Sequence, residues 1–241
     1  MAEPSSLKHR IRNGEFVNGL GVSMDSSRDD LERILQQDQI DFFNVDCQHG
    51  PQSEDRIVSF CASAEALGVP VILRIKHTRH TYLIGNYLDL GPAGILVPEV
   101  KEEATVQEAI HFFYYPQFGG RSWGGSARHG IRDRSDRLEY AAWWNDTGML
   151  WLQLESVEAV INCRQLALDG VDVLTFGPND LMYDIERYHR PPFRTVEDCV
   201  RHVAREMEGT SVAVSLALLD PSERDKYIEM GLTVLQTPMV V

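Results

Sequence analysis

The sequence lacks the features that mark nucleic-acid-binding and membrane proteins. Its 23 lysines and arginines are outnumbered by 36 aspartates and glutamates, which gives a net charge of −13 at pH 7. Polyanions are held by clustered positive charge, so an acidic chain is a poor candidate for binding them. No apolar run reaches the roughly 20 residues that a membrane-spanning helix needs. We therefore expect no nucleic-acid partner and no membrane partner.

Cysteine is also scarce and shows no pairing pattern. The four cysteines are widely spaced and include no C-x-x-C pair, at Cys47, Cys61, Cys163 and Cys199. This pattern favours free thiols in a reducing compartment over disulfides or a zinc site. The first 16 residues contain no apolar core of the kind found in a signal peptide. These observations predict a cytoplasmic protein.

The chain does contain a regular alternation of short apolar runs and segments with helical spacing. Alternation of this kind indicates a parallel sheet, and eight strands within 241 residues favour one (β/α)₈ TIM barrel spanning residues 1–241. A doubly wound open sheet is the alternative. The chain stops after the eighth strand, which predicts that the final helix is absent. The expected strands are 19–24, 42–46, 70–75, 93–98, 149–155, 171–176, 211–217 and 232–237.

Two helix starts and one long loop can also be assigned. Thr195 and Asp198 have the spacing of a capping box at the start of a helix. Asp220 and Glu223 predict a second helix start of the same kind. Residues 116–136 contain no predicted element, and a loop of this length is usually functional or disordered.

Unusual polar residues follow several of the predicted strands. The active sites of TIM barrels lie at the carboxyl ends of the strands, so such residues meet at one end of the barrel. Side chains alternate along a strand, which places Gln153 and Glu155 on one face, with Leu152 and Leu154 on the other. The residues expected at this end are Asp46, His49, Arg74, Gln153, Glu155 and Asp180.

These side chains suit chemistry through an enolate. Glu155 and Asp180 offer the oxygen ligands that Mg²⁺ or Mn²⁺ prefers. The arginine at position 74 can stabilise an oxyanion, and His49, oriented by Asp46, can act as a general base. The turn at 177–180, "GPND", offers backbone N–H groups to a carboxylate or phosphate.

Each residue also has a structural interpretation. Asp180 can cap a helix, Glu155 can form an ion pair with Arg74, and His49 can be an exposed turn residue. Two other chemistries remain open, namely a Schiff base on Lys76 and a metal bound by His77 and His80. A non-catalytic barrel that binds a keto acid is a further alternative.

Six segments together carry a resemblance that extends from about residue 15 to residue 235. The sequence resembles the HpcH/HpaI family of class II, metal-dependent pyruvate aldolases. This resemblance implies a (β/α)₈ barrel that reversibly cleaves a 4-hydroxy-2-oxo acid to pyruvate and an aldehyde. The segments are "DFFNVDCQHGP", "VILRI", "YLDLGPAGILVPEV", "GGRSWGGSAR", "QLESVEAVIN" and "GVDVLTFGPNDL".

The resemblance also implies roles for individual residues. Glu155 and Asp180 would bind a divalent metal (Mg²⁺, Mn²⁺ or Co²⁺), Arg74 would stabilise the enolate, and His49 with Asp46 would act through water on the C4 hydroxyl. The residues that would contact the pyruvate moiety are Gln153, Gly177, Pro178 and Asn179.

Asp89 and Arg121 match further family positions. Asp89 would help to complete the aldehyde side of the site at a subunit contact in a homo-oligomer, and Arg121 matches the arginine of a substrate-binding loop. The five arginines between 121 and 137 could hold an anionic tail, with ordinary surface pairing as the alternative.

The chain departs from the family pattern at several positions. Gln48 stands where a glutamate is usual, Ser122 replaces the first glycine of the arginine loop, and Ser215 stands where a glycine is common. Oxaloacetate decarboxylation and cleavage of a β-hydroxyacyl-CoA are the alternative reactions for such a site.

Overall fold

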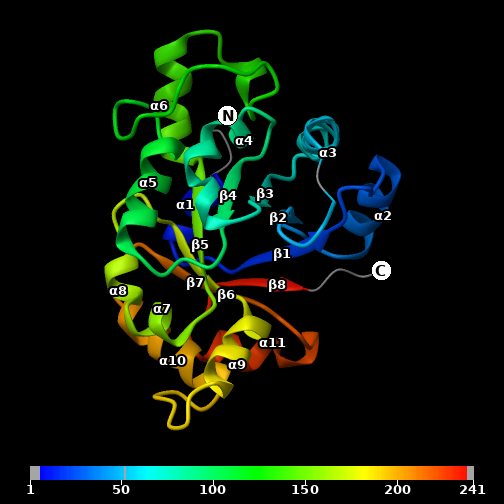
Figure 1. Ribbon diagram of the computed structural model, residues 1–241. Helices are drawn as coiled ribbons and strands as arrows, with labels where there is room; N and C mark the ends of the chain where they lie inside the picture. Colours follow the sequence, from blue (N-terminus) through cyan, green and yellow to red (C-terminus); the bar gives the residue numbers. More distant parts are fainter. Residues whose placement is uncertain (1–5, 52, 238–241) are drawn as a thin grey trace.

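The protein is a closed barrel of eight parallel strands, in sequence order around the ring. The computed structural model describes residues 6–51 and 53–237, and Figure 1 shows the strands surrounded by helices. The predicted TIM barrel is confirmed, and the doubly wound alternative is excluded because β1 pairs with β8. The strands are β1 Val17–Val22, β2 Phe42–Asp46, β3 Val71–Arg74, β4 Gly94–Val97, β5 Met149–Leu154, β6 Val173–Phe176, β7 Ala213–Ala217 and β8 Val234–Thr237.

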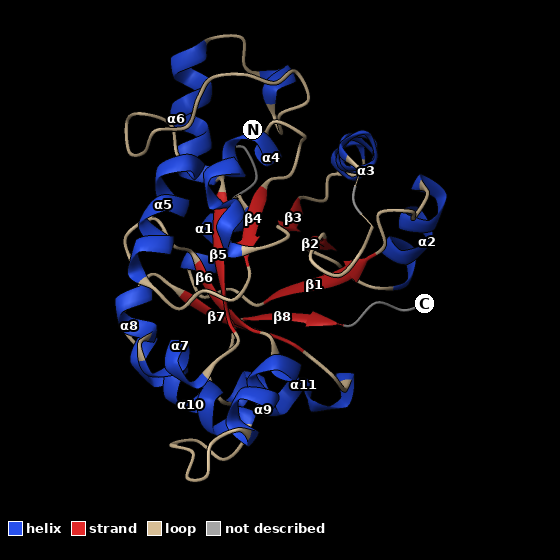
Figure 2. Ribbon diagram, viewed as in Figure 1, coloured by secondary structure: helices blue, strands red, loops and turns tan. Residues whose placement is uncertain are grey.

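Helices connect the strands and cover the outside of the barrel (Figure 2). The α-helices are α1 Leu7–Arg12, α2 Arg28–Gln37, α3 Glu54–Ala66, α4 Ile84–Leu88, α5 Glu103–Phe113, α6 Arg137–Thr147, α7 Val157–Ile161, α8 Cys163–Leu166, α9 Pro178–Glu186, α10 Val196–Met207 and α11 Arg224–Glu229. Short 3₁₀ helices cover Thr78–Leu83, Ile131–Asp133 and Pro221–Glu223.

Local signals in the sequence were mostly, but not always, correct. The capping box of Thr195 and Asp198 opens α10 as predicted. The predicted cap at Asp220 is confirmed, but the box with Glu223 is wrong, because Asp220 accepts from the Ser222 N–H and opens a 3₁₀ turn. The first strand begins two residues before its predicted start, since Val17 pairs with Val234 on the closing strand.

The alternation of side chains along β5 separates the barrel interior from the helical layer. Leu150, Leu152 and Leu154 belong to the large core between strands and helices. Met149 and Trp151 belong to a second, smaller cluster, which joins residues of other strands inside the barrel. The Phe42 ring of this cluster meets Trp151 edge to face, at 5.0 Å between centroids. An apolar floor therefore fills the barrel, and Gln153 continues the same inward-facing row toward the carboxyl end.

The amino end of the barrel is closed by α1 and a buried ion-pair network. Lys8 is 1% exposed, lies 3.2 Å from Asp172 and donates hydrogen bonds to Tyr114 Oη and the Gly148 carbonyl. Burial lowers the pKa of Lys8 although Asp172 opposes the shift, and burial raises the pKa of Asp172. These contacts hold α1 against the amino end, whereas the active sites of TIM barrels lie at the carboxyl end.

The other expectations from composition have mixed outcomes. All four cysteines are free, as predicted, and all four are buried. No helix among the described residues is long and apolar enough to cross a membrane. The segment in which a helix after β8 would begin lies outside the described residues, which end at Thr237.

Candidate functional site

Arg74 and Asp46 form the best-defined contact at the carboxyl end of the barrel. They are partners in the register of β2 and β3, which aligns their side chains. Arg74 Nε donates to Asp46 Oδ1 at 2.8 Å, and Nη2 donates to Oδ2. Burial acts to raise the pKa of Asp46, but the hydrogen bonds and charge of Arg74 outweigh it and lower that pKa. Asp46 is therefore held as a carboxylate.

The same arginine reaches across the barrel to β5. Arg74 Nη1 lies 3.3 Å from Gln153 Oε1, and Gln153 is buried. This contact confirms that Gln153 points into the barrel, as the alternation along the strand predicted. The guanidinium is thus anchored on two sides, which leaves it oriented toward the space above the apolar floor.

Glu155 lies directly after β5 and is buried at the mouth. Burial raises its pKa to about 7, against hydrogen bonding by the Glu99 N–H and the charge of Arg74. The negative charges of Asp180 and Glu99 raise this pKa further. A buried carboxylate beside two other carboxylates is repelled by their negative charges, and a bound cation would offset this repulsion.

The "GPND" turn lies against Glu155. A Cβ at Gly177 would lie 2.2 Å from Glu155 Oε1 and 2.7 Å from Gln153 Nε2, so a larger residue would displace these two side chains. Pro178 opens α9, and Asp180 follows in the first turn with an exposed side chain. The alternative that Asp180 caps α9 is excluded, because the N-cap is Gly177 and no side chain bonds there. The expected proximity of this turn to the β5 carboxylate is confirmed.

One residue of the site escaped the sequence analysis. Glu99 follows β4, its backbone N–H donates to Glu155 Oε2 at 2.8 Å, and its carboxylate accepts from Gln48 Nε2 at 2.7 Å. Its position directly after a predicted strand, as for the other candidates, was a signal that could have revealed it.

His49 is placed differently from the expectation. Its side chain is exposed, and among the described residues no hydrogen bond joins it to Asp46. Asp46 is instead paired with Arg74 and accepts the Gln48 N–H. His49 is still near enough for its charge to lower the pKa of Asp46.

The residues present fit a divalent cation. Glu155 and Asp180 are oxygen donors from neighbouring strand ends, and their mutual repulsion is the cost that a cation would remove. No group of three or more His, Cys, Asp or Glu side chains is arranged as a complete metal site in the described part of the chain. Two carboxylates alone would leave coordination positions open for water and substrate.

Asp89 and Arg121 lie at the other end of the barrel. Asp89 follows α4 and precedes β4, and Arg121 Nη2 donates to its Oδ1 at 2.9 Å. Arg121 is buried between the rings of Tyr115 and Trp144. Figure 1 shows α6, which follows this loop, at the end where β5 begins. The structure therefore does not bring these two residues to the mouth within one chain. The role of Asp89 at a subunit contact and that of Arg121 in a substrate-binding loop remain predictions.

The loop at 116–136 is ordered around buried arginines. Arg128 stacks on Trp123, with 3.9 Å between its Cζ and the ring centroid, and donates to the Gly125 carbonyl. The expectation of an anionic-tail site or of surface pairing is thus wrong for Arg121 and Arg128, because aromatic rings and buried partners hold both side chains.

The alternative chemistries lose support from the local geometry. Lys76 is exposed, and β3 ends at Arg74, so the strand does not carry Lys76 into the barrel. His77 accepts from the Arg79 N–H, and His80 bonds to Tyr87 Oη. Each histidine therefore has a structural partner of its own, and the two do not share a metal site.

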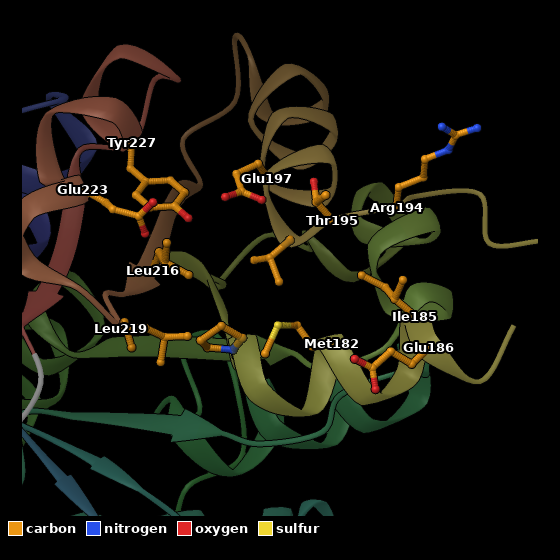
Figure 3. A pocket seen from close by; sticks show the side chains of 13 residues that line it. Met182, Ile185, Glu186, Arg194, Thr195, Glu197, Leu216, Leu219, Glu223 and Tyr227 are labelled. Atoms are coloured by element: carbon orange, nitrogen blue, oxygen red, sulfur yellow. The ribbon is translucent and has the colours of Figure 1, made fainter.

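A hollow of about 310 Å³ lies beside the site, between α9, α10 and the segment after β7. Figure 3 shows Met182, Leu216 and Leu219 around it. Of the site residues, Pro178 alone lines this pocket. The polar groups needed for the expected chemistry lie inside the barrel mouth instead.

Comparison with known proteins identifies the family. The family model of the HpcH/HpaI aldolase/citrate lyase family matches residues 20–239. The chain belongs to this family. It is accordingly an enzyme, an aldolase of the carbon–carbon lyase class.

Curated and solved members show how far the similarity extends. The 2-keto-3-deoxy-L-rhamnonate aldolase of Klebsiella pneumoniae is 29% identical over 232 residues, covering 93% of this chain and 83% of the relative. The enzyme of the same name from Escherichia coli K12 is 29% identical over 82% of this chain and 74% of its own length. The crystal structure of an HpcH/HpaI aldolase from Desulfitobacterium hafniense has a TM-score of 0.84 at 27% identity, covering 98% of this chain and 91% of that chain.

Proposed function

We propose that this family member cleaves a 4-hydroxy-2-oxo acid, of the 2-keto-3-deoxy sugar-acid type, to pyruvate and an aldehyde. The observation that carries the proposal is the contact between Arg74 and Gln153 beside the buried carboxyl group of Glu155. It places a permanent cation next to the candidate metal ligand. The named activity of the two relatives supports the same type of substrate.

The residues at the mouth divide the reaction between them. A divalent cation on Glu155 and Asp180 would supply Lewis-acid polarisation of the 2-oxo group. Arg74 would stabilise the negative charge that develops on the C2 oxygen as the C3–C4 bond breaks. The backbone N–H groups of the 177–180 turn would receive the substrate carboxylate at the start of α9.

His49 is the residue proposed to move the proton. Retro-aldol cleavage removes the proton of the C4 hydroxyl, leaves an aldehyde, and places the electron pair on C3. The exposed imidazole of His49 can accept that proton through a water molecule and later return it. Asp46 would act indirectly, because it holds Arg74 in place.

We further propose that residues 1–241 form one domain of a cytoplasmic homo-oligomer. Asp89 lies away from the mouth of its own chain, so it could contribute to a site only from a neighbouring subunit, and Arg121 would hold its carboxylate in place.

The direct test measures pyruvate release from a panel of 4-hydroxy-2-oxo acids that differ in chain length and hydroxylation. Activity should disappear on treatment with EDTA and return with Mg²⁺, Mn²⁺ or Co²⁺. Replacing Glu155 or Asp180 with alanine should abolish both activity and Mn²⁺ binding. Turnover that survives complete metal removal would refute the proposal, and turnover of oxaloacetate alone would favour a decarboxylase.

A further inference from the structure

Glu99 is the unusual residue of the mouth. With φ of +51°, it is the single residue other than glycine with positive φ in residues 6–51 and 53–237. A side chain in this left-handed region costs energy and persists where surrounding contacts hold it. The conformation directs the Glu99 N–H to Glu155 Oε2, at 2.8 Å. The backbone of Glu99 therefore holds one oxygen of the candidate metal ligand.

The side chain of Glu99 is held in turn by Gln48. Gln48 Nε2 donates to Glu99 Oε1 at 2.7 Å, across the gap between the segments that follow β2 and β4. The backbone N–H of Gln48 donates to Asp46 Oδ1 at 2.8 Å, so Gln48 is itself fixed at the mouth. A continuous series of hydrogen bonds thus connects Arg74, Asp46, Gln48, Glu99 and Glu155.

We propose that Gln48 and Glu99 form a positioning pair for Glu155. Gln48 holds the Glu99 carboxylate, which keeps Glu99 in its left-handed conformation and its N–H on Glu155. The pair also determines the charge at the carboxyl end of the barrel. Gln48 is a neutral donor and Glu99 a carboxylate, so together they carry one negative charge. The inference rests on the proposed function in one respect, namely that Glu155 binds the metal.

The pairing requires one amide and one carboxylate. With Glu at position 48, two carboxylates would face each other without a proton between them, and like charges at hydrogen-bond distance repel. If the two carboxylates moved apart, Glu99 would no longer be held in its left-handed conformation. Its N–H would then no longer donate to Glu155. Simple electrostatics predicts the opposite outcome, since an added negative charge near a metal site should strengthen cation binding. The two explanations can therefore be separated by the sign of one effect.

The experiment titrates metal-free protein with Mn²⁺ alone and follows the heat of binding. We expect Q48E to weaken Mn²⁺ affinity about 10-fold or more, within the range of about 10–100-fold seen when outer partners of metal ligands are changed. E99Q should weaken affinity by about 3-fold, because it keeps an acceptor for Gln48 and loses the charge (about 0.6 kcal/mol). The reciprocal variant Q48E/E99Q should return to within about 3-fold of wild type.

A matched control is Q36E, which adds the same charge at an exposed glutamine of α2 and should leave affinity unchanged. Thermal unfolding of each metal-free variant separates loss of positioning from loss of the fold, and rescue by Q48E/E99Q does so independently.

Affinity of Q48E equal to or tighter than wild type would overturn the inference, as would a double variant as weak as Q48E. Loss of binding in Glu155→Ala with unchanged binding in Q48E would refute the positioning pair alone. A wild-type protein that binds no Mn²⁺ would refute the proposed metal site together with it.

Discussion

Arg74 and Asp46 face each other across two neighbouring strands, and the guanidinium occupies both oxygens of the carboxylate. This contact determines the roles of two other residues. Asp46 is paired with Arg74 and not with His49, and Arg74 is held with its remaining nitrogen toward Gln153. The site is thus organised around an arginine–carboxylate pair, with the histidine outside it.

The first prediction concerns the geometry of this pair. R74K keeps the positive charge and loses the two-pronged contact with Asp46, because lysine cannot form it. We expect kcat/KM to fall by about 10²-fold or more, as for loss of an oxyanion donor. Steady-state pyruvate release measures the effect. R79K, on an exposed neighbour, is the control, and equal activity of R74K and R79K would contradict the role of Arg74.

The second prediction tests the cradle formed by Gly177. G177A would place a Cβ 2.2 Å from Glu155 Oε1, so the carboxylate must move. Mn²⁺ affinity should fall by about 10-fold or more. Calorimetry measures this, with G85A as the control, because a Cβ there would meet nothing nearer than 3.4 Å. Unchanged affinity in G177A would show that Glu155 does not need this position.

The third prediction follows from the raised pKa of Glu155. Since its pKa is about 7 in the metal-free protein, the carboxyl group is mostly protonated below pH 7 and must lose its proton to bind a metal. Mn²⁺ affinity should therefore fall by about tenfold for each pH unit below 7 and level off above pH 8. Binding heats in buffers of different ionisation enthalpy should show release of about one proton at pH 6.

The same shift also affects stability, with a definite sign. The folded pKa lies above the unfolded one, so this group stabilises the metal-free fold below about pH 4.5, and the contribution is lost as pH rises through 7. The E155Q variant should lack this part of the pH dependence in urea unfolding. Identical profiles for wild type and E155Q would contradict the burial of an ionisable Glu155.

The fourth prediction concerns the ion-pair network at the amino end of the barrel. K8M leaves Asp172 buried with Arg12 as its remaining cationic partner, and should lower the free energy of unfolding by about 3 kcal/mol. K8M/D172N should regain part of that loss, since no buried charge is left without its lysine. Urea unfolding measures both, with K101M at an exposed lysine as the control. A K8M protein as stable as K101M would show that this network does not stabilise the fold.

The sequence by itself determined the barrel and most of the residues at its mouth. Strand–helix alternation follows from local hydrophobic patterning, and the parity of Gln153 and Leu154 follows from the geometry of an extended chain. Because the carboxyl ends of parallel strands meet at one end, the placement of Arg74, Glu155 and Asp180 could also be inferred without coordinates.

Only the tertiary structure decided how these side chains pair. The partner of Asp46 depends on the register between β2 and β3, which local sequence patterns do not reveal. The contact of Gln48 with Glu99 joins loops 51 positions apart, and the left-handed conformation of Glu99 has no signature in a single sequence. The loop that carries Arg121 appeared equally suited to binding a substrate or facing solvent until burial between two rings showed its position. Hydrogen bonding and burial across distant segments depend on the closed barrel as a whole, so they are decided only after it forms.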